Sequence, residues 1–381
     1  MTAALDLHLN RDQRDLYERT RELASETLAP IADAGPADRV NRPLVAALAQ
    51  HGLLARLFER DEVSAIELCL IREALARGCT GAETAFALQG LGAYPIVQAG
   101  RHELQAEWVP RVAAGTAVAA FALTEPDAGS DPGALSLHAS PDGEGGYVLS
   151  GEKLWISNAP DADIYTVFAR TEAAPGARGL TAFAVPGDAP GLSGEPREML
   201  APHAIGSLTF EEVRVGPAQV LGEPGAGFRV AMRTLDLFRP SVGAFAIGMA
   251  RTALEMAVSH AVTRQTFGKP LAGHQAVAHR LAELHAQTEA ARLLVHQAAL
   301  AHDAGAPDPA LAAMAKLLAT EVAQAAVDAA VQFHGAAALE HGHPLEHLYR
   351  DVRAPRIYEG ASEIQREIIS RALFRAAEGR E

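Results

Sequence analysis

The sequence predicts a multidomain α+β protein, with an all-α N-terminal domain, a middle β-barrel or sandwich domain and a C-terminal helical bundle. Its 381 residues exceed what a single small core needs. Helical spacing of apolar residues fills the first and last thirds, whereas short aromatic and β-branched runs fill the stretch between them. The expected domains are residues 1–118, 119–226 and 227–381.

Several helices are expected in the first domain. Leu16, Leu23 and Leu28 recur at helix-compatible spacing from Asp12 onward, and prolines interrupt the run that follows. None of these segments contains a chemical motif. The further helices are expected at Leu44–His51, Ala65–Arg77, Glu83–Leu91 and Glu103–Ala114.

Short strands separated by Gly, Pro and Asp are expected in the middle domain, whose size of about a hundred residues is typical of a small barrel or sandwich. They are expected at Phe121–Thr124, Tyr147–Ser150, Lys153–Ser157, Ile164–Ala169, Thr181–Val185, Ser207–Glu211 and Val213–Val215. In the last domain, Phe228–Arg264, Gln275–Ala304 and Ala310–Gln332 are expected to be long helices. Their short connections predict a bundle, and the abundant alanine predicts close packing.

The composition argues against several classes of function. The formal net charge of -14 argues against binding to nucleic acids or anionic membranes. Cys69 and Cys79 are the only cysteines, so neither a disulfide framework nor a zinc ribbon is expected. Residues 1–10 show no basic segment followed by an apolar run, and no long apolar stretch is evident elsewhere. We therefore expect a cytoplasmic protein.

A carboxylate followed by glycine precedes the last helix. Glu359 lies between Tyr358 and Gly360, and Ser362 and Gln365 have the S-x-x-Q spacing of a capping box. A carboxylate at such a helix entry can point into a cavity rather than into solvent. A surface-loop acid fits the same pattern, because helix starts attract acids.

Two motifs in the middle domain carry groups that could hold a flat polar ring. Phe121–Asp131 (F-A-L-T-E-P-D-A-G-S-D) runs from a strand into a turn, which projects backbone N–H groups and hydroxyls from one loop. In Lys153–Ala159 (K-L-W-I-S-N-A), strand alternation places Trp155 and Ser157 on one face and Ile156 on the other. A simple β-turn fits the first segment equally well, and a core tryptophan is, without context, the better explanation of the second.

A third motif separates two of the long helices. Arg264–Lys269 (R-Q-T-F-G-K), followed by His274 and Gln275, forms a basic break that contains a glycine. Such a break suits the pyrophosphate or adenine end of a nucleotide. A plain helix–helix connection explains the glycine as well.

Taken in order, the motifs T-E-P-x-A-G-S-D, K-x-W-I-[ST]-N-A, R-x-x-F-G-K and I-Y-E-G-[TA] resemble those of the acyl-CoA dehydrogenase family, over essentially the whole chain. The resemblance implies a helical N-terminal domain, a β middle domain and a C-terminal four-helix bundle. It also implies FAD between the last two domains and a homotetramer, with a dimer as the minimum. The implied reaction oxidises an acyl-CoA thioester to the trans-2-enoyl thioester and passes the electrons to an electron-transferring flavoprotein.

The resemblance further implies a set of FAD contacts. Thr124 and the nearby backbone contact the polar edge of the flavin ring, Trp155 packs against the ring, and Ser157 takes the hydroxyl position near N5. The segment at Arg264 reaches the FAD of a neighbouring subunit, and the segment at Gln332 contacts the pyrophosphate or adenosine part. The full set is Phe121, Leu123, Thr124, Gly129, Ser130, Trp155, Ile156, Ser157, Arg264, Thr266, Phe267, His274, Gln275, Gln332, Phe333, His334, Gly335, Ala336, Ala361 and Glu363.

By the same resemblance, Glu359 removes the substrate α-proton while the β-hydrogen leaves as hydride to flavin N5. Burial beside an apolar pocket would raise the proton affinity of this carboxylate. Some relatives carry their base at the position of Phe238, which cannot take a proton. An ion pair within one helix explains Asp236 and Arg239 as well as a substrate role does. The expected substrate contacts are Ser130, Asp236, Arg239, Tyr358 and Gly360.

Two departures from the family pattern affect these expectations. Gly335-Ala336-Ala337-Ala338 replaces a glycine-rich run, so its methyl groups are expected to displace the adenosine end or weaken FAD affinity without abolishing it. Ala361 removes a hydroxyl near FAD. The alanine run leaves open a non-catalytic relative that binds flavin poorly. The fold also leaves open a flavin enzyme that acts on a carrier-protein-bound acyl group, or one with oxidase, monooxygenase or desulfinase chemistry.

No motif specifies the acyl group, and no metal is expected. The histidine-rich segment before the last helices has a spacing that matches no common ligand pattern, so solvated turn histidines are the expectation. Its members are His334, His341, His343 and His347, with Glu346.

Overall fold

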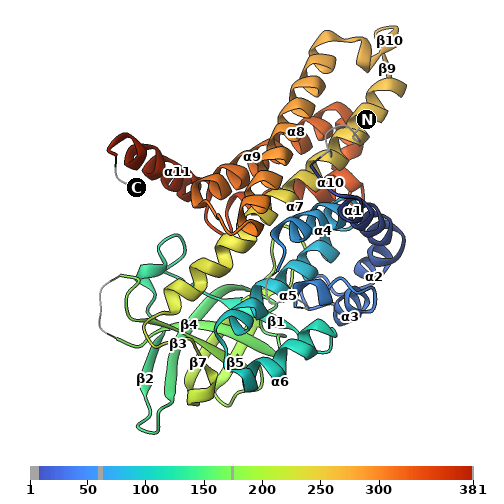
Figure 1. The fold of residues 1–381 in the computed structure, drawn as a ribbon. Coiled ribbons are helices and arrows are strands. Elements are labelled where there is room, and N and C mark those ends of the chain that lie inside the picture. The colour runs from blue at the N-terminus through green and yellow to red at the C-terminus, as the bar shows by residue number, and fades with distance from the viewer. Residues whose placement is uncertain (1–7, 59–62, 173–175, 380–381) are drawn as a thin grey trace. The chain divides into compact units, whose positions relative to one another are not determined.

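The computed structural model describes residues 8–58, 63–172 and 176–379, which form two compact units (Figure 1). Unit 1 combines Met1–Ala29, Ser64–Glu83 and Asp236–Glu381, and unit 2 combines Pro30–Val63 and Thr84–Leu235. Helices α5 (Thr80–Ala99) and α7 (Gly227–Thr263) each begin in one unit and end in the other. The units therefore divide the chain differently from the three expected sequence domains.

Unit 2 is built on one mixed sheet, for which the described residues supply eight strands. Its order is β6-β7-β3-β2-β4-β5-β8, and β1 pairs in parallel with β4. The β domain expected between two helical regions is confirmed. The strands are β1 (Ala119–Ala122), β2 (His138–Pro141), β3 (Tyr147–Ser157), β4 (Ile164–Arg170), β5 (Leu180–Pro186), β6 (Leu192–Pro196), β7 (Ile205–Val215) and β8 (Val220–Leu221).

Four of the predicted strands are merged into two longer ones. Strand β3 joins the two strands predicted on either side of Gly151, and β7 joins those predicted on either side of Glu212. The register of β3 against β7 shifts between Leu149 and Gly151, which indicates a bulge where the sequence indicated a turn. Strands β2 and β6 were not predicted, because H-A-S-P and L-S-G-E-P are short and poor in β-branched residues.

Both faces of the sheet are covered. On β4, Tyr165 and Val167 belong to one buried apolar cluster and Ile164 and Phe168 to another, as strand alternation requires. The first cluster contains side chains from β3, β5 and β7, and the second includes side chains from α5 and α6 (His102–Ala113). Because both faces are buried, β4 and β5 are nearly continuous apolar runs.

Unit 1 is helical and contains the bundle formed by α7, α8, α9 and α11. A Cβ at Gly243 of α7 would lie 2.7 Å from Val295 of α8 and 3.3 Å from Ala319 of α9, so these three helices approach closely. This agrees with the packing expected from the alanine content. The helices of both units not yet given bounds are α1 (Arg11–Leu23), α2 (Ala29–Asp33), α3 (Arg42–Gln50), α4 (Ala65–Gly78), α8 (Gln275–Asp303), α9 (Pro309–His334), α10 (Pro344–Asp351) and α11 (Ser362–Ala377).

Within the described residues, two helical segments are long and apolar enough to cross a membrane by length and composition alone, which corrects the expectation that no long apolar stretch exists. They are Gly227–Thr263 and Pro309–Leu339. An apolar stretch of 18 residues within each segment is 78% buried in the first segment and 56% buried in the second. That burial is typical of core helices in a folded domain.

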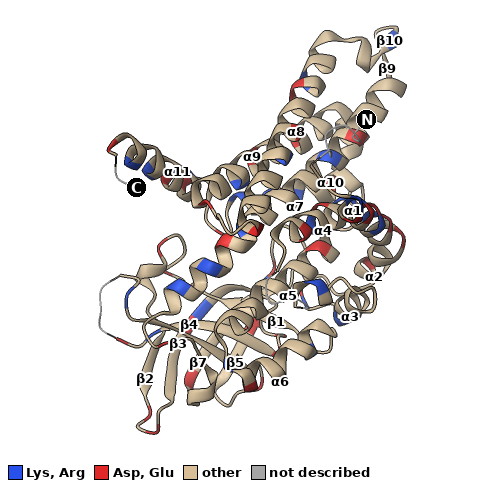
Figure 2. Ribbon diagram, viewed as in Figure 1, with Lys and Arg blue, Asp and Glu red and all other residues tan. Residues whose placement is uncertain are grey.

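Charged residues of both signs lie along α1, and acidic residues mark the tip of the β2–β3 hairpin (Figure 2). On α1, Arg21 and Glu18 form an exposed ion pair at 3.0 Å. Exposed pairs of this kind contribute little to stability, because water and salt screen them.

Gly92 of α5 lies where unit 2 leaves no room for a side chain. A Cβ there would lie 2.5 Å from the backbone nitrogen of Ala120 in β1. We expect Gly92→Ala to lower the free energy of unfolding by about 1–3 kcal/mol through overpacking, as measured by urea denaturation. Gly216→Ala is the control, since its Cβ would approach only Gln219, at 3.8 Å. Equal stability of the two variants would contradict the close approach.

Candidate active site

Glu359 lies in a left-handed turn between the short helix Ala354–Arg356 and α11. The φ angle is 49° at Glu359 and 89° at Gly360. A glutamate rarely adopts such a φ, so surrounding contacts must hold it. Gln365 Nε2 donates to Gly360 O at 2.8 Å, and a Cβ at Gly360 would lie 2.5 Å from that nitrogen. The position after the glutamate therefore requires glycine.

The predicted capping box at Ser362 and Gln365 is wrong. Helix α11 begins at Ser362 itself, so Ala361 is the N-cap residue. Ser362 Oγ donates to Glu321 Oε1 of α9 at 2.7 Å, and the Gln365 amide supports the Glu359 turn. Because α11 begins one residue earlier than predicted, the Ser362 and Gln365 side chains form these tertiary contacts instead of a capping box.

One carboxylate oxygen of Glu359 is buried and unpaired. The residue as a whole is only half-buried, but its Oε2 atom has no hydrogen-bond partner among the described residues. Burial raises the pKa of Glu359 above the usual glutamate value, and the positive charges of Arg72, Lys316 and Arg239 oppose that rise. An unsatisfied carboxylate with raised proton affinity is suited to accept a proton.

A buried polar group that the sequence did not reveal acts on this carboxylate. Arg72 of α4 forms an ion pair with Glu83 and donates through Nη1 to Ser241 Oγ of α7 at 2.7 Å. All three side chains are buried. They come from ordinary helical stretches, so no motif could have indicated them.

Two of the expected substrate contacts in unit 1 pair with each other. Arg239 Nη1 donates to Asp236 Oδ1 at 2.7 Å, as the ion-pair alternative predicted. Arg239 is buried, and its Nε finds no acceptor in the described part of the chain. Burial also raises the pKa of Tyr358 well above its usual range, so its hydroxyl stays neutral. A role of these residues or Gly360 in substrate binding stays a prediction.

In unit 2, a buried ion pair joins the two strand motifs. Lys153 Nζ donates to Glu125 Oε1 at 2.8 Å and to Leu123 O at 2.9 Å. Burial alone would raise the pKa of Glu125, but Lys153 and the N–H groups of Ser136 and Leu137 bring it below its usual value. Burial lowers the pKa of Lys153 to about 8. Both residues lie inside the quoted motifs, where their pairing could have been suspected but was not predicted.

Trp155 lies at an irregular point of β3. Its φ is 58°, and the register against β7 shifts between Lys153 and Ile156. The indole is 49% exposed, so the core-tryptophan alternative is wrong. Ile156 packs in the sheet core, which leaves only its backbone available to a ligand. Ser157 Oγ lies 2.8 Å from His203 Nε2, a neighbour that the sequence did not indicate.

The loop after β1 lies beside this strand. Leu154 N donates to Thr124 O at 3.0 Å, which joins the two motifs through the backbone as well. A Cβ at Gly129 would meet nothing within 4 Å. The structure therefore joins the two middle-domain motifs at Leu123–Glu125 and Lys153–Leu154. In the first motif Phe121, Leu123 and Thr124 are half-buried, and Gly129 and Ser130 are exposed.

The predicted break between α7 and α8 is a short β-hairpin with a two-residue turn (Figure 1). Strand β9 (Gln265–Thr266) pairs with β10 (Lys269–Pro270), and φ is positive at both turn residues, Phe267 and Gly268. Phe267 is 97% exposed at the tip. His274 Nε2 lies 3.2 Å from Thr266 Oγ1. The remaining expected contacts of this segment, Arg264 and Gln275, are exposed beside the hairpin.

The last group of expected FAD contacts lies at the ends of α9 and α11. Gly335 ends α9 with a φ of 67°, and the His334 ring stacks on His260 with centroids 4.2 Å apart. No cluster of three or more His, Cys, Asp or Glu suited to a metal ion occurs among residues 8–58, 63–172 and 176–379. Gln332, Ala336 and Glu363 are exposed, and Phe333 and Ala361 are half-buried.

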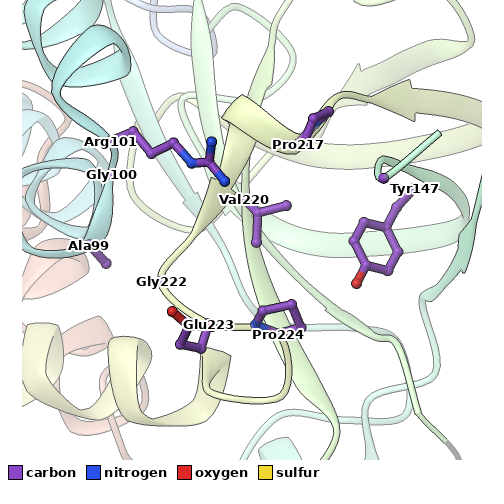
Figure 3. Close-up of a pocket in the computed structure, with 10 residues that line it drawn as sticks. Ala99, Gly100, Arg101, Tyr147, Pro217, Val220, Gly222, Glu223 and Pro224 are labelled. Carbon is purple, nitrogen blue, oxygen red and sulfur yellow. The ribbon is translucent and has the colours of Figure 1, made fainter.

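Figure 3 shows a pocket of about 320 Å³ in unit 2, with Arg101 and Tyr147 on its walls. Pro217, Val220 and Glu223 also line it. None of the residues expected to bind FAD or substrate does so. This pocket is therefore separate from the residues that the motifs indicate.

The residues of the strand motifs fit a flavin. A flat ring needs an accessible apolar platform and nearby polar groups, and unit 2 supplies both. Trp155 gives an exposed indole, Ser157 gives a hydroxyl, and a Cβ at Gly129 would meet no atom of the described residues beyond its chain neighbours within 4 Å.

Comparison with known proteins identifies the family. The N-terminal, middle and C-terminal domains of acyl-CoA dehydrogenase match residues 10–116, 120–214 and 225–374. The chain is 35% identical to cyclohexane-1-carbonyl-CoA dehydrogenase of Geobacter metallireducens over 377 residues, which cover 97% of this chain and 99% of that one.

Solved structures agree with this match. Butyryl-CoA dehydrogenase from Megasphaera elsdenii is 33% identical, with a TM-score of 0.91 covering 96% of this chain and 99% of that one. An FAD complex of PigA is 29% identical, with a TM-score of 0.90 covering 96% and 98%. The chain belongs to the acyl-CoA dehydrogenase family, whose members are FAD-dependent. It is an oxidoreductase of that class.

The Glu125–Lys153 pair should be important for stability. We expect Glu125→Gln to lower the free energy of unfolding by about 3–5 kcal/mol, because it leaves a buried ammonium without its carboxylate. Glu18→Gln removes the exposed pair with Arg21 and should cost less than about 1 kcal/mol. Urea denaturation of both variants measures the difference. Small, similar losses would mean that the buried pair is not needed to hold the motif loop.

Proposed function

We propose that this protein catalyses the FAD-dependent α,β-dehydrogenation of an acyl-CoA thioester to the trans-2-enoyl-CoA, with Glu359 as the base that removes the α-proton. The observation that carries the proposal is the buried Oε2 atom of Glu359, which has no partner in the described part of the chain, in a member of this family. That atom can gain a proton without breaking an existing hydrogen bond. Phe238, at the alternative base position, has no titrating group.

Two opposing effects set the proton affinity of Glu359. Burial favours the neutral acid, whereas Arg72, Lys316 and Arg239 favour the carboxylate. Above the resulting pKa the group is ionised and can take the α-proton. That proton is weakly acidic, so the thioester carbonyl must also accept hydrogen bonds, and the Glu359 backbone N–H is the donor that the family resemblance suggests.

The cofactor contacts are proposed on the same basis. FAD, when bound, supplies the acceptor for the β-hydrogen and its electron pair. Trp155, Ser157 and Thr124 would hold the ring system, which the exposed Trp155 indole and the hydrogen bond from Leu154 N to Thr124 O support. Arg264 and Thr266 in the hairpin region would contact the nucleotide of a neighbouring subunit.

An oligomer and an electron-accepting partner follow from the family resemblance. We propose a homotetramer, or at least a dimer, that passes electrons to an electron-transferring flavoprotein in the cytoplasm. Exposed apolar side chains support the oligomer: Phe267 lies at the hairpin tip, and Leu373 and Phe374 on α11 are 65% and 67% exposed.

The acyl group and its carrier are open to a direct assay. The relatives named for cyclohexane-1-carbonyl-CoA and butyryl-CoA support a CoA thioester with an acyl group of undetermined size. Anaerobic bleaching of the flavin by a panel of acyl-CoA thioesters would rank the acyl groups. Bleaching by the same acyl groups only on a carrier protein would replace CoA in the proposal, and rapid oxygen consumption would indicate an oxidase.

Glu359→Gln tests the proposed base. The variant should still bind FAD but reduce it about 10²–10⁴-fold more slowly with acyl-CoA, because an amide cannot accept the α-proton. Stopped-flow absorbance under anaerobic conditions measures the rate. Glu367→Gln, on α11 with a side chain that is 53% exposed, is the matched control. Near wild-type reduction by Glu359→Gln would remove Glu359 as the base, and a wild-type protein that binds no FAD would refute the flavin chemistry itself.

A further inference from the structure

Two of the three lysines in this chain are fully buried. Lys153 and Lys316 have no exposed surface, whereas Lys269 lies on the hairpin and is exposed. Each buried ammonium donates to a backbone carbonyl within a predicted site segment, Lys153 to Leu123 O and Lys316 to Gly360 O. A compact ammonium suits such a contact better than a guanidinium, which is the cation this chain uses at almost all its other positions.

Lys316 reaches from α9 to the turn that carries Glu359. Its Nζ donates to Gly360 O at 2.7 Å, and Gln365 Nε2 of α11 donates to the same oxygen at 2.8 Å. The peptide that follows Glu359 is therefore held from two helices. This support matters because both residues of the turn have positive φ.

We propose that Lys316 is a positioning residue for Glu359: its ammonium fixes the left-handed turn through the Gly360 carbonyl and supplies a buried positive charge that favours the ionised carboxylate. The catalytic meaning of this proposal rests on the proposed role of Glu359 as the base. The hydrogen bond from Lys316 to Gly360 O does not depend on that role.

The electrostatic setting gives the proposal a measurable consequence. Burial lowers the pKa of Lys316 to about 8, and the Glu359 carboxylate opposes that fall. Lys316 is thus protonated at neutral pH and loses its charge as the pH rises through about 8. The other charged groups that act on Lys316 or Glu359 are Arg72 (α4), Arg239 (α7), Glu321 (α9) and Glu363 (α11).

A first experiment measures the coupling without turnover. In FAD-loaded protein labelled with [ε-¹³C]lysine, only three side chains give signals, and Lys316→Met assigns the one of interest. The titration midpoint of the Lys316 signal should lie near pH 8 in the wild type. In Glu359→Gln it should fall by about one unit, because the stabilising carboxylate is gone. The Lys269 signal is the internal control, and an unchanged Lys316 midpoint would overturn the coupling.

A second experiment follows the pH dependence of anaerobic flavin reduction by acyl-CoA. In the plot of reduction rate against pH, Lys316→Met should move the acidic limb to higher pH by about one unit, because removing a neighbouring cation raises the pKa of Glu359. Lys316→Arg keeps the charge and should keep the limb near its wild-type position, and Lys269→Met should leave it unchanged. A purely structural anchor would lower stability in both Lys316 variants without separating their pH limbs.

The outcomes distinguish the two proposals. If the wild type is reduced by acyl-CoA but Lys316→Met keeps the wild-type limb, Lys316 is not a positioning residue and the dehydrogenase proposal stands. If the wild type is not reduced at all, the dehydrogenase proposal fails, and the lysine titration still decides whether Lys316 and Glu359 are coupled.

Discussion

The rest of the site depends on the carboxylate of Glu359, whose Oε2 atom is buried without a hydrogen-bond partner among the described residues. An isolated carboxylate in such a place would cost several kcal/mol and take up a proton. Arg72, Arg239 and Lys316 oppose this from three helices. Within the ranges that the structure describes, Arg72 pairs with Glu83 and Arg239 with Asp236, and neither forms an ion pair with Glu359. The carboxylate can therefore ionise without being neutralised in an ion pair, which is the condition a base requires.

Backbone strain is concentrated at positions that the sequence predicted to be site residues. Among the described residues, positive φ outside glycine occurs at Trp155, Asn158, Glu212, Phe267 and Glu359, three of which were singled out from the sequence as site residues. Each such conformation costs about 1–3 kcal/mol and persists only where neighbouring contacts determine it. At Glu359 those contacts are the Gln365 amide and the Lys316 ammonium. Beside Trp155 the buried Lys153 ties the bulged strand to the loop after β1.

The sequence predicted the features that periodicity and local motifs encode. The helix–strand–helix order follows from the spacing of apolar residues, and the T-E-P and K-x-W-I motifs indicated the segments that the structure joins. What it could not supply were contacts made by tertiary packing. Lys316 and Gly360 are 44 positions apart, and Arg72 and Ser241 are 169 apart. Gly360 lies in the I-Y-E-G motif, but Lys316, Arg72 and Ser241 lie in no distinctive local pattern. The one bulge between Leu149–Gly151 of β3 and Phe210–Val213 of β7 resembles a turn in each strand until the pairing of the two strands sets the register.

The residues of the alanine run after Gly335 differ in whether they could affect FAD affinity. Gly335 keeps the one backbone position that needs glycine, with a φ of 67°, and positive φ does not occur at the three alanines. Ala338 is buried and adds packing within unit 1, so its methyl group is not directed at a ligand. Only Ala336 and Ala337 expose their methyl groups. Any weakening of FAD affinity by this run must therefore come from these two side chains, because neither the backbone nor the buried methyl group provides a cause.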